Sequence, residues 1–196
     1  MPTADARVDS EPLSSVLITG ELYARSLCPL DSERVNEALR QLGQTITESP
    51  NRLLESLVTV TLELCRAGTA GLSVLERNGD GNLQFRWDYL AGGLAGFVGG
   101  TTPRDWSPCG VTLDLNSPQL FDRPARHFTY FRAAEPEIIE GLVLPIVLDD
   151  GLPYGTLWIV SHDDQRKFNS EDVRVMQSLC SFTAAAARIL GFKPRL

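Results

Sequence analysis

Apolar residues change their period along this chain, and that change constrains the fold more than any other feature. In LQFRWDYL, residues 83–90, apolar and polar side chains alternate strictly, which is typical of a half-buried β-strand. The strand-like run GLSVLER and the turn NGDGN precede it and complete a hairpin pattern. Two more strand-like runs, IIEGLVLPIVL and YGTLWIV, lie between residues 138 and 160 around the turn DDGLP. The sequence therefore predicts two antiparallel hairpins. In the alternating strand, four residues are expected on one face: Leu83, Phe85, Trp87 and Tyr89.

Helical patterns flank the two hairpins. A cap at Asp31 or Ser32 can begin a helix that runs through residue 46, and the serine-proline pair at 49–50 begins a second helix. The last helix starts within FNSEDV, residues 168–173, which fits a capping box. The first helix carries a narrow apolar seam suited to packing on one neighbouring helix: Val35, Leu39, Leu42 and Ile46.

The stretch from Ala91 to Pro136 separates the hairpins and is called the cover here. It is rich in glycine and proline, and it has little periodicity. A compact domain rarely carries so long an irregular stretch unless that stretch covers a site. The simplest arrangement is an α+β fold with one antiparallel sheet. Helices lie on one face, and a cavity separates the other face from the cover. The cover is dense in aromatic residues: Phe97, Trp106, Phe121, Phe128, Tyr130 and Phe131.

Composition excludes several classes of function. The net charge is −7 and lysine and arginine are scattered, so no basic face predicts a nucleic-acid partner. No apolar run reaches the roughly 20 residues of a membrane span, and the acidic first twelve residues do not form a secretory signal. We therefore expect a cytoplasmic protein without membrane contact. The four cysteines lie far apart with no histidine at metal-ligand spacing, so no metal site is expected.

Two segments carry a resemblance to a known family. The ending EGLVLPIVLDDGLPYGTLWIVSHDDQRKFNSEDVRVMQSLCSFTAAAA, residues 140–187, resembles the GAF domain, a small-molecule-sensing relative of the PAS domain. PRDWSPCG, residues 103–110, is similar to a loop of GAF modules linked to bacterial histidine kinases. The resemblance implies a ligand pocket under the cover, a homodimer formed through the terminal helices, and a histidine kinase or other signalling protein as partner.

The resemblance and the element order together give a division of the chain into four parts. Residues 1–12 are expected to be a disordered leader, and 13–49 an N-terminal helical extension in which 13–27 is only weakly helical. Residues 50–191 are expected to form the GAF/PAS-like domain, and 192–196 a tail.

Cys109 raises the question of chemistry, because it stands in a segment expected to be a loop. Free methionine-(R)-sulfoxide reductases are GAF-fold enzymes that use cysteines, but this route needs a second thiol, and none lies between Cys65 and Cys109 or between Cys109 and Cys180. Phytochrome-type domains attach a bilin at a cysteine followed by histidine, whereas neither His127 nor His162 follows a cysteine. We therefore expect no covalent bilin and no enzyme. The reductase remains one alternative, and an assembly or dimerisation module with a vestigial pocket remains another.

Non-covalent binding of an unidentified small molecule, as part of a sensory or regulatory role, is the leading interpretation. Pockets are mostly apolar and contain a few placed polar groups. The cofactor, if any, is not indicated by the sequence. The candidate walls are aromatic: Trp87, Tyr89, Phe97, Trp106, Phe128 and Tyr130. The candidate directional contacts are Arg104, Cys109 and Glu140.

Overall fold

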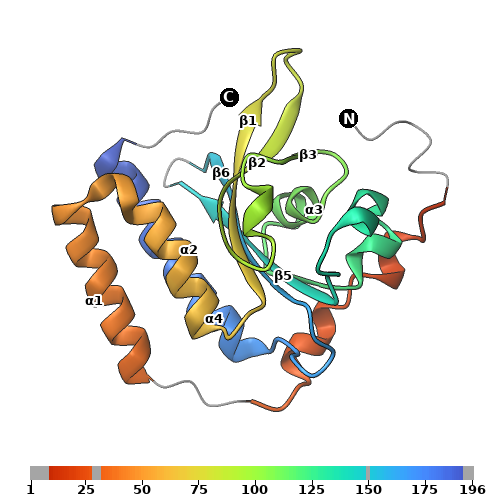
Figure 1. The fold of residues 1–196 in the computed structure, drawn as a ribbon, viewed down its shortest axis with the longest axis horizontal. Helices are drawn as coiled ribbons and strands as arrows, with labels where there is room; N and C mark the ends of the chain where they lie inside the picture. The colour runs from red at the N-terminus through yellow and green to blue at the C-terminus, as the bar shows by residue number, and fades with distance from the viewer. Residues whose placement is uncertain (1–8, 28–31, 149–150, 192–196) are drawn as a thin grey trace.

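A six-stranded antiparallel sheet organises the molecule (Figure 1). The computed structural model describes residues 9–27, 32–148 and 151–191. Cys28, Asp31, the Asp149–Asp150 part of the predicted turn, most of the predicted leader and the tail lie outside these residues. The strand order is β3-β2-β1-β6-β5-β4, and every neighbouring pair is antiparallel. The strands are β1 (Thr69–Arg77), β2 (Leu83–Gly92), β3 (Thr101–Pro103), β4 (Gln119–Asp122), β5 (Glu140–Val147) and β6 (Pro153–Ser161).

Two apolar cores lie on opposite faces of this sheet. Helices α1 (Ser32–Glu48), α2 (Leu53–Leu64) and α4 (Ser170–Leu190) form one layer, with α1 outermost. The other face is covered by α3 (Pro108–Leu115) and by several short 3₁₀ helices. The alternation within strands assigns side chains to the two cores: Leu72 of β1 packs toward the helices and Leu75 toward the cover. The predicted α+β arrangement is confirmed.

The strict alternation predicted for β2 is interrupted by a bulge. Leu72 pairs with Tyr89, but the next residue, Ser73, pairs with Trp87, so the register passes over Asp88. An extra residue in one strand reverses the faces of the residues beyond it. Trp87 therefore lies on the cover side, while Tyr89 packs against the helix-side core.

The cover is more regular than its sequence predicted. It contains two strands of the sheet, β3 and β4, and the eight-residue helix α3. Ser107 caps α3 by accepting a hydrogen bond from the Gly110 N–H at 3.0 Å, and Pro108 occupies the first helical position. The prediction of an irregular loop around Cys109 is wrong. The serine-proline start signal was present, but a helix of this length is too short to show a clear apolar period.

The N-terminal segment runs along the edge of the sheet instead of forming a separate α-helix. It contains two 3₁₀ helices, Leu13–Ser15 and Thr19–Tyr23. The Ile18 N–H donates to the carbonyl of Leu120, and the Asp122 N–H donates to that of Val16, each at 2.8 Å. These bonds satisfy the outer edge of β4, which would otherwise expose unpaired backbone groups. Glu11 also contacts Arg126 of the cover: its backbone N–H donates to the Arg126 carbonyl at 3.0 Å, and its carboxylate pairs with the Arg126 guanidinium at 3.3 Å.

The last helix agrees with its sequence signals, whereas the predicted helix start at Ser49–Pro50 is the 3₁₀ helix Pro50–Arg52, and α2 begins at Leu53 without a side-chain cap. The capping box of Asn169 and Asp172 begins α4, and Gly191 ends it in the left-handed conformation at φ 70°. Leu42 of the α1 seam is buried, and Val35, Leu39 and Ile46 are partly buried against the helix-side core. The seam is therefore used for packing within the chain. No helix in the described ranges is long and apolar enough to cross a membrane.

Candidate functional site

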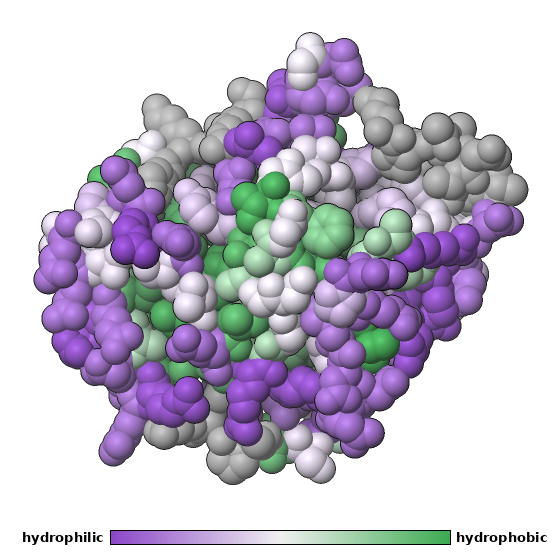
Figure 2. Space-filling view, in the orientation of Figure 1, coloured by the Kyte–Doolittle hydropathy of each residue, from purple (hydrophilic) through white to green (hydrophobic). Residues whose placement is uncertain are grey.

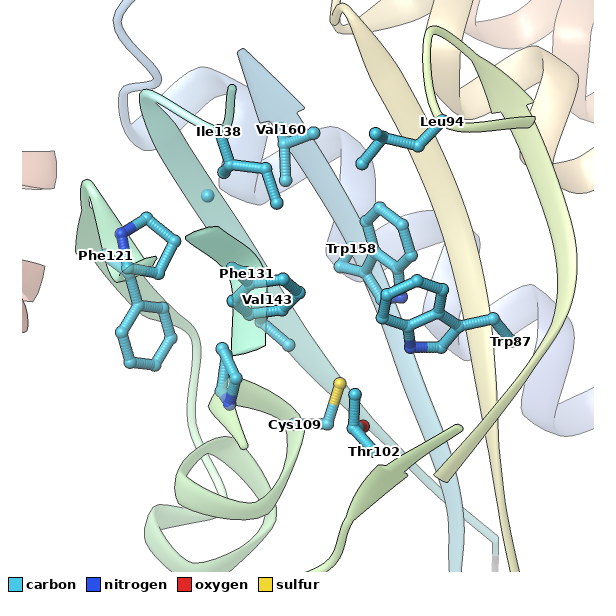
Figure 3. A pocket seen from close by; sticks show the side chains of 13 residues that line it. Trp87, Leu94, Thr102, Cys109, Phe121, Phe131, Ile138, Val143, Trp158 and Val160 are labelled. Atoms are coloured by element: carbon cyan, nitrogen blue, oxygen red, sulfur yellow. The ribbon is translucent and has the colours of Figure 1, made fainter. Parts of the chain in front are cut away.

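A small apolar cavity lies between the sheet and the cover (Figure 3). Its volume is about 40 Å³, room for about three water molecules. Trp87 and Trp158 form one wall, and Leu94, Ile138 and Val160 lie at one end. The thiol of Cys109 lies at the opposite end. The surface around the cover is mainly hydrophilic, with apolar residues showing at the centre of the face drawn in Figure 2.

Aromatic rings hold the cover on the sheet. The Trp87 ring stacks on Phe131 of the cover at 6.2 Å between centroids, and its edge meets Trp158 at 6.0 Å. The Trp158 indole lies over Gly71, where a Cβ atom would overlap it, and its Nε1–H donates to Ser73 Oγ at 2.8 Å. Glycine at position 71 is therefore required for the position of this indole.

The Cys109 end of the cavity gathers polar groups. The Cys109 thiol faces the hydroxyls of Thr156 and Ser73. Burial raises the pKa of this thiol; contacts with the two hydroxyls and its own backbone N–H oppose the rise only partly. Tyr130 lies near the same thiol, and burial raises its pKa well above the usual value. The thiol and the phenol are therefore neutral near pH 7.

Charged side chains are absent from the lining that the described residues provide. The described ranges also contain no group of three or more histidine, cysteine or acidic residues able to hold a metal ion. The site thus combines apolar walls with neutral hydrogen-bonding groups, an arrangement suited to binding.

His162 contacts residues that adjoin the two ends of the cover. Its Nδ1 contacts the carbonyl oxygen of Glu137 at 2.7 Å, and its Nε2 contacts Thr69 Oγ1 at 2.8 Å. Thr69 Oγ1 accepts the Leu94 N–H at 3.0 Å. A neutral imidazole protonated on Nδ1 satisfies every one of these contacts, because it donates to Glu137 and accepts from Thr69. Leu94 lines the cavity, so this chain of bonds positions part of its wall.

Two of the predicted site residues line the cavity, and three others lie in the apolar cluster on the same face. Trp87 and Cys109 are lining residues. Trp106, Phe128 and Tyr130 pack together behind the cavity wall, with Trp106 meeting Tyr130 edge-on at 5.6 Å. These aromatic residues therefore lie on the same face of the sheet as the cavity.

Four predicted site residues lie elsewhere. The β2 bulge places Tyr89 on the helix face, and the alternation of β5 places Glu140 there too, bonded to Arg25 and to the backbone N–H of Phe168. Phe97 is 43% exposed on the 3₁₀ helix Ala95–Phe97. Arg104 bonds the Gly110 carbonyl and Asp114, and it does not line the cavity.

The wall contributed by β5 and β6 was not predicted from the sequence. Gly141, Val143, Trp158 and Val160 line the cavity from these strands. Both strands are almost continuously apolar and buried on both faces, so alternation could not assign their residues to a face. The signal that could have found them is their odd or even spacing from Glu140. Side chains alternate between the two faces of a strand, and Glu140 is a charged residue that needs its own buried partner.

Comparisons with known proteins agree with this architecture. The sequence model of the GAF domain family matches residues 47–187, well over half of the chain. A search of curated protein sequences found no match.

Several solved GAF structures share the fold at low sequence identity. The GAF domain of a phosphoenolpyruvate-protein phosphotransferase from Coxiella burnetii is 18% identical with a TM-score of 0.62, covering 82% of this chain and 98% of that one. The GAF-B domain of DevS from Mycobacterium smegmatis is 19% identical with a TM-score of 0.58, covering 73% and 96%. Free methionine-R-sulfoxide reductase from Neisseria meningitidis, solved with its substrate, is 15% identical with a TM-score of 0.61, covering 84% and 95%.

Proposed function

The chain belongs to the GAF domain family, and on that premise we propose that it is a sensory or regulatory domain that binds a small molecule in the cavity under the cover. The observation that carries this proposal is the cavity itself, with its apolar walls and its neutral polar end. Ligand entry would require the cover to move, because the cavity is small. The bonds of His162 and the stack of Trp87 on Phe131 are the contacts that resist this movement.

A route from the cavity to the terminal elements supports a signalling role. Gly141 lines the cavity, and the preceding residue, Glu140, faces the other side of the sheet. Glu140 binds Arg25 of the N-terminal segment and the Phe168 N–H, two residues before α4 begins. A shift of β5 on ligand binding would therefore reach the N-terminal segment and α4 together. Such coupling requires the ligand to bind the two arrangements with different affinity.

The same proposal includes the molecules that would respond to this shift of β5. A second copy of the chain, or a partner such as a histidine kinase, would contact the terminal helices. The α1 seam packs within the chain, so a dimer would use other residues of α1 and α4. Ile189, 68% exposed near the end of α4, is the apolar contact that α4 offers.

The three tryptophans of the chain make binding measurable. Trp87 and Trp158 line the cavity and Trp106 lies behind its wall, so the indole N–H signals in a ¹H–¹⁵N spectrum report on this site. A Cβ at Gly141 would make ordinary contacts, so Gly141→Ala places a methyl group in the cavity without a clash. Gly43→Ala, which adds a methyl group in open space on α1, is the matched control.

The screen should include nucleotides, haem and small neutral metabolites. We expect saturable indole shifts with at least one compound, weakened in Gly141→Ala and retained in Gly43→Ala. If no compound shifts the indole signals, the binding role fails. The cavity of about 40 Å³ would then favour an assembly module whose pocket is filled by its own side chains.

An enzymatic alternative remains, because the fold is similar to that of the sulfoxide reductase and Cys109 lines the cavity. Burial of the thiol opposes it, because a raised pKa leaves little of the thiolate that attacks sulfur. A coupled assay with free methionine-(R)-sulfoxide discriminates the two roles. Turnover that is lost in Cys109→Ser would replace the binding role by the enzymatic one.

A further inference from the structure

Hydroxyl groups without partners surround the Cys109 thiol. Thr102 lines the cavity and is 3% exposed, yet its Oγ1 has no hydrogen-bond partner in the described part of the chain. The buried Tyr130 hydroxyl likewise has no hydrogen-bond partner in the described part of the chain. Thr156 Oγ1 faces the thiol, but it makes no hydrogen bond of normal geometry among the described residues. Unmade hydrogen bonds are costly inside a protein, and native proteins retain few of them. These three groups therefore indicate a polar guest.

The surroundings define the charge of that guest. No charged side chain lines the cavity among the described residues, and its remaining lining is apolar or aromatic. A carboxylate, phosphate or ammonium group placed there would lose its hydration without gaining an opposite charge. The same burial raises the pKa of the Cys109 thiol, which is the direction expected where an added charge is disfavoured.

The same groups define the hydrogen-bonding character of the guest. Hydroxyls and a thiol can each donate a hydrogen bond. Cys109 is the second residue of α3, and the amino end of a helix carries partial positive charge. Both features favour a ligand atom that accepts hydrogen bonds over a ligand atom that donates them.

We propose that the cavity binds a small uncharged molecule whose single acceptor atom, such as a carbonyl oxygen, lies between Thr102 and Cys109, with the Tyr130 hydroxyl behind the wall near the same thiol and the apolar remainder against Trp87 and Trp158. This inference rests on the proposed function, because it names the class of ligand for that same cavity. The volume of about 40 Å³ holds about three water molecules, so a larger ligand requires the cover to move.

Three probes of the same branched, planar shape test the ligand class. Acetone offers a neutral acceptor, isobutene is its apolar counterpart, and acetate is its charged counterpart. Each is titrated into the full chain while the indole N–H signals of Trp87 and Trp158 are followed. Thr102→Val and Tyr130→Phe remove one hydroxyl each with little change of shape. Thr183→Val, on the helix face of the sheet, is the control.

We expect acetone to bind saturably and acetate not to bind. At least one of Thr102→Val and Tyr130→Phe should weaken acetone roughly 2- to 10-fold, which is the value of one neutral hydrogen bond. The same variant should leave isobutene binding unchanged, and Thr183→Val should change neither affinity.

Two results would overturn the inference. Acetate binding as tightly as acetone would refute the uncharged class, and equal effects of both hydroxyl variants on acetone and isobutene would refute the acceptor site. Either result leaves the proposed binding function standing, because a probe still occupies the cavity. If none of the three probes gives a saturable shift, the proposal for the cavity fails together with the ligand class.

Discussion

Removal of Arg25 should show how strongly the N-terminal segment is bound to the sheet. The Glu140 side chain is fully buried, and the Arg25 guanidinium donates to both of its carboxylate oxygens at 2.9 and 2.8 Å. Arg25 also donates to the Phe168 carbonyl at 2.7 Å. Arg25→Met keeps much of the side-chain bulk but leaves a buried carboxylate whose nearest remaining cation is the Lys167 ammonium, 3.9 Å away.

The magnitude follows from burial. Removing one partner of a buried ion pair costs about 3–5 kcal/mol, because the remaining charge is left without compensation. For a chain of this length each kcal/mol lowers the melting temperature by about 2–4 °C, so we expect a decrease of roughly 6–20 °C. Arg25→Met/Glu140→Gln should be more stable than Arg25→Met alone, because the uncompensated charge is removed.

Urea unfolding followed by tryptophan fluorescence measures these differences. Arg40→Met is the control: the Arg40–Glu37 pair is closer, at 2.6 Å, but 56% and 48% exposed, so solvent screening should leave little measurable loss. The reasoning is refuted if Arg25→Met costs no more than Arg40→Met, or if the double variant is less stable than Arg25→Met.

Three further predictions concern the cover and the cavity. His162→Ala removes the bond to Thr69, which holds the Leu94 amide of the cover, and the bond to Glu137, which follows the cover, so it should cost about 1–3 kcal/mol and accelerate hydrogen exchange at the Leu94 amide; unchanged exchange would contradict the anchoring role. Thr102→Val removes no protein hydrogen bond and should not lower the free energy of unfolding, whereas Thr183→Val loses its bond to a backbone carbonyl and should lower it by about 1 kcal/mol; urea unfolding of both variants measures the contrast. The Cys109 thiol should react with a disulfide reagent far more slowly at pH 7 than a free cysteine does, and faster as the pH rises, because its pKa is raised; a rapid reaction at pH 7 would show that the cover opens freely.

Local signals in the sequence determined much of this fold. The helix caps, the hairpin turn and the change of apolar period indicated the order of helices and strands before any contact was known. Asn169 with Asp172 predicted the start of α4 because both interactions of a capping box are local. The aromatic cover likewise indicated which region lies over the cavity. Such features are fixed within a few residues, so the sequence displays them directly.

Register and side-chain partners were decided only by the tertiary structure. The bulge at Asp88 depends on pairing with β1, and it separates Trp87 from Tyr89 although both fit one alternating pattern. The role of Glu140 depends on Arg25, a residue distant in sequence that the alternation of β5 cannot reveal. Cavity size and unpartnered hydroxyls also arise from packing between distant segments. The sequence thus determined most helices and strands of this protein and the face of the sheet on which the cavity lies, while pairing across the sheet decided which side chains line that cavity, because a one-residue shift in register reverses every face.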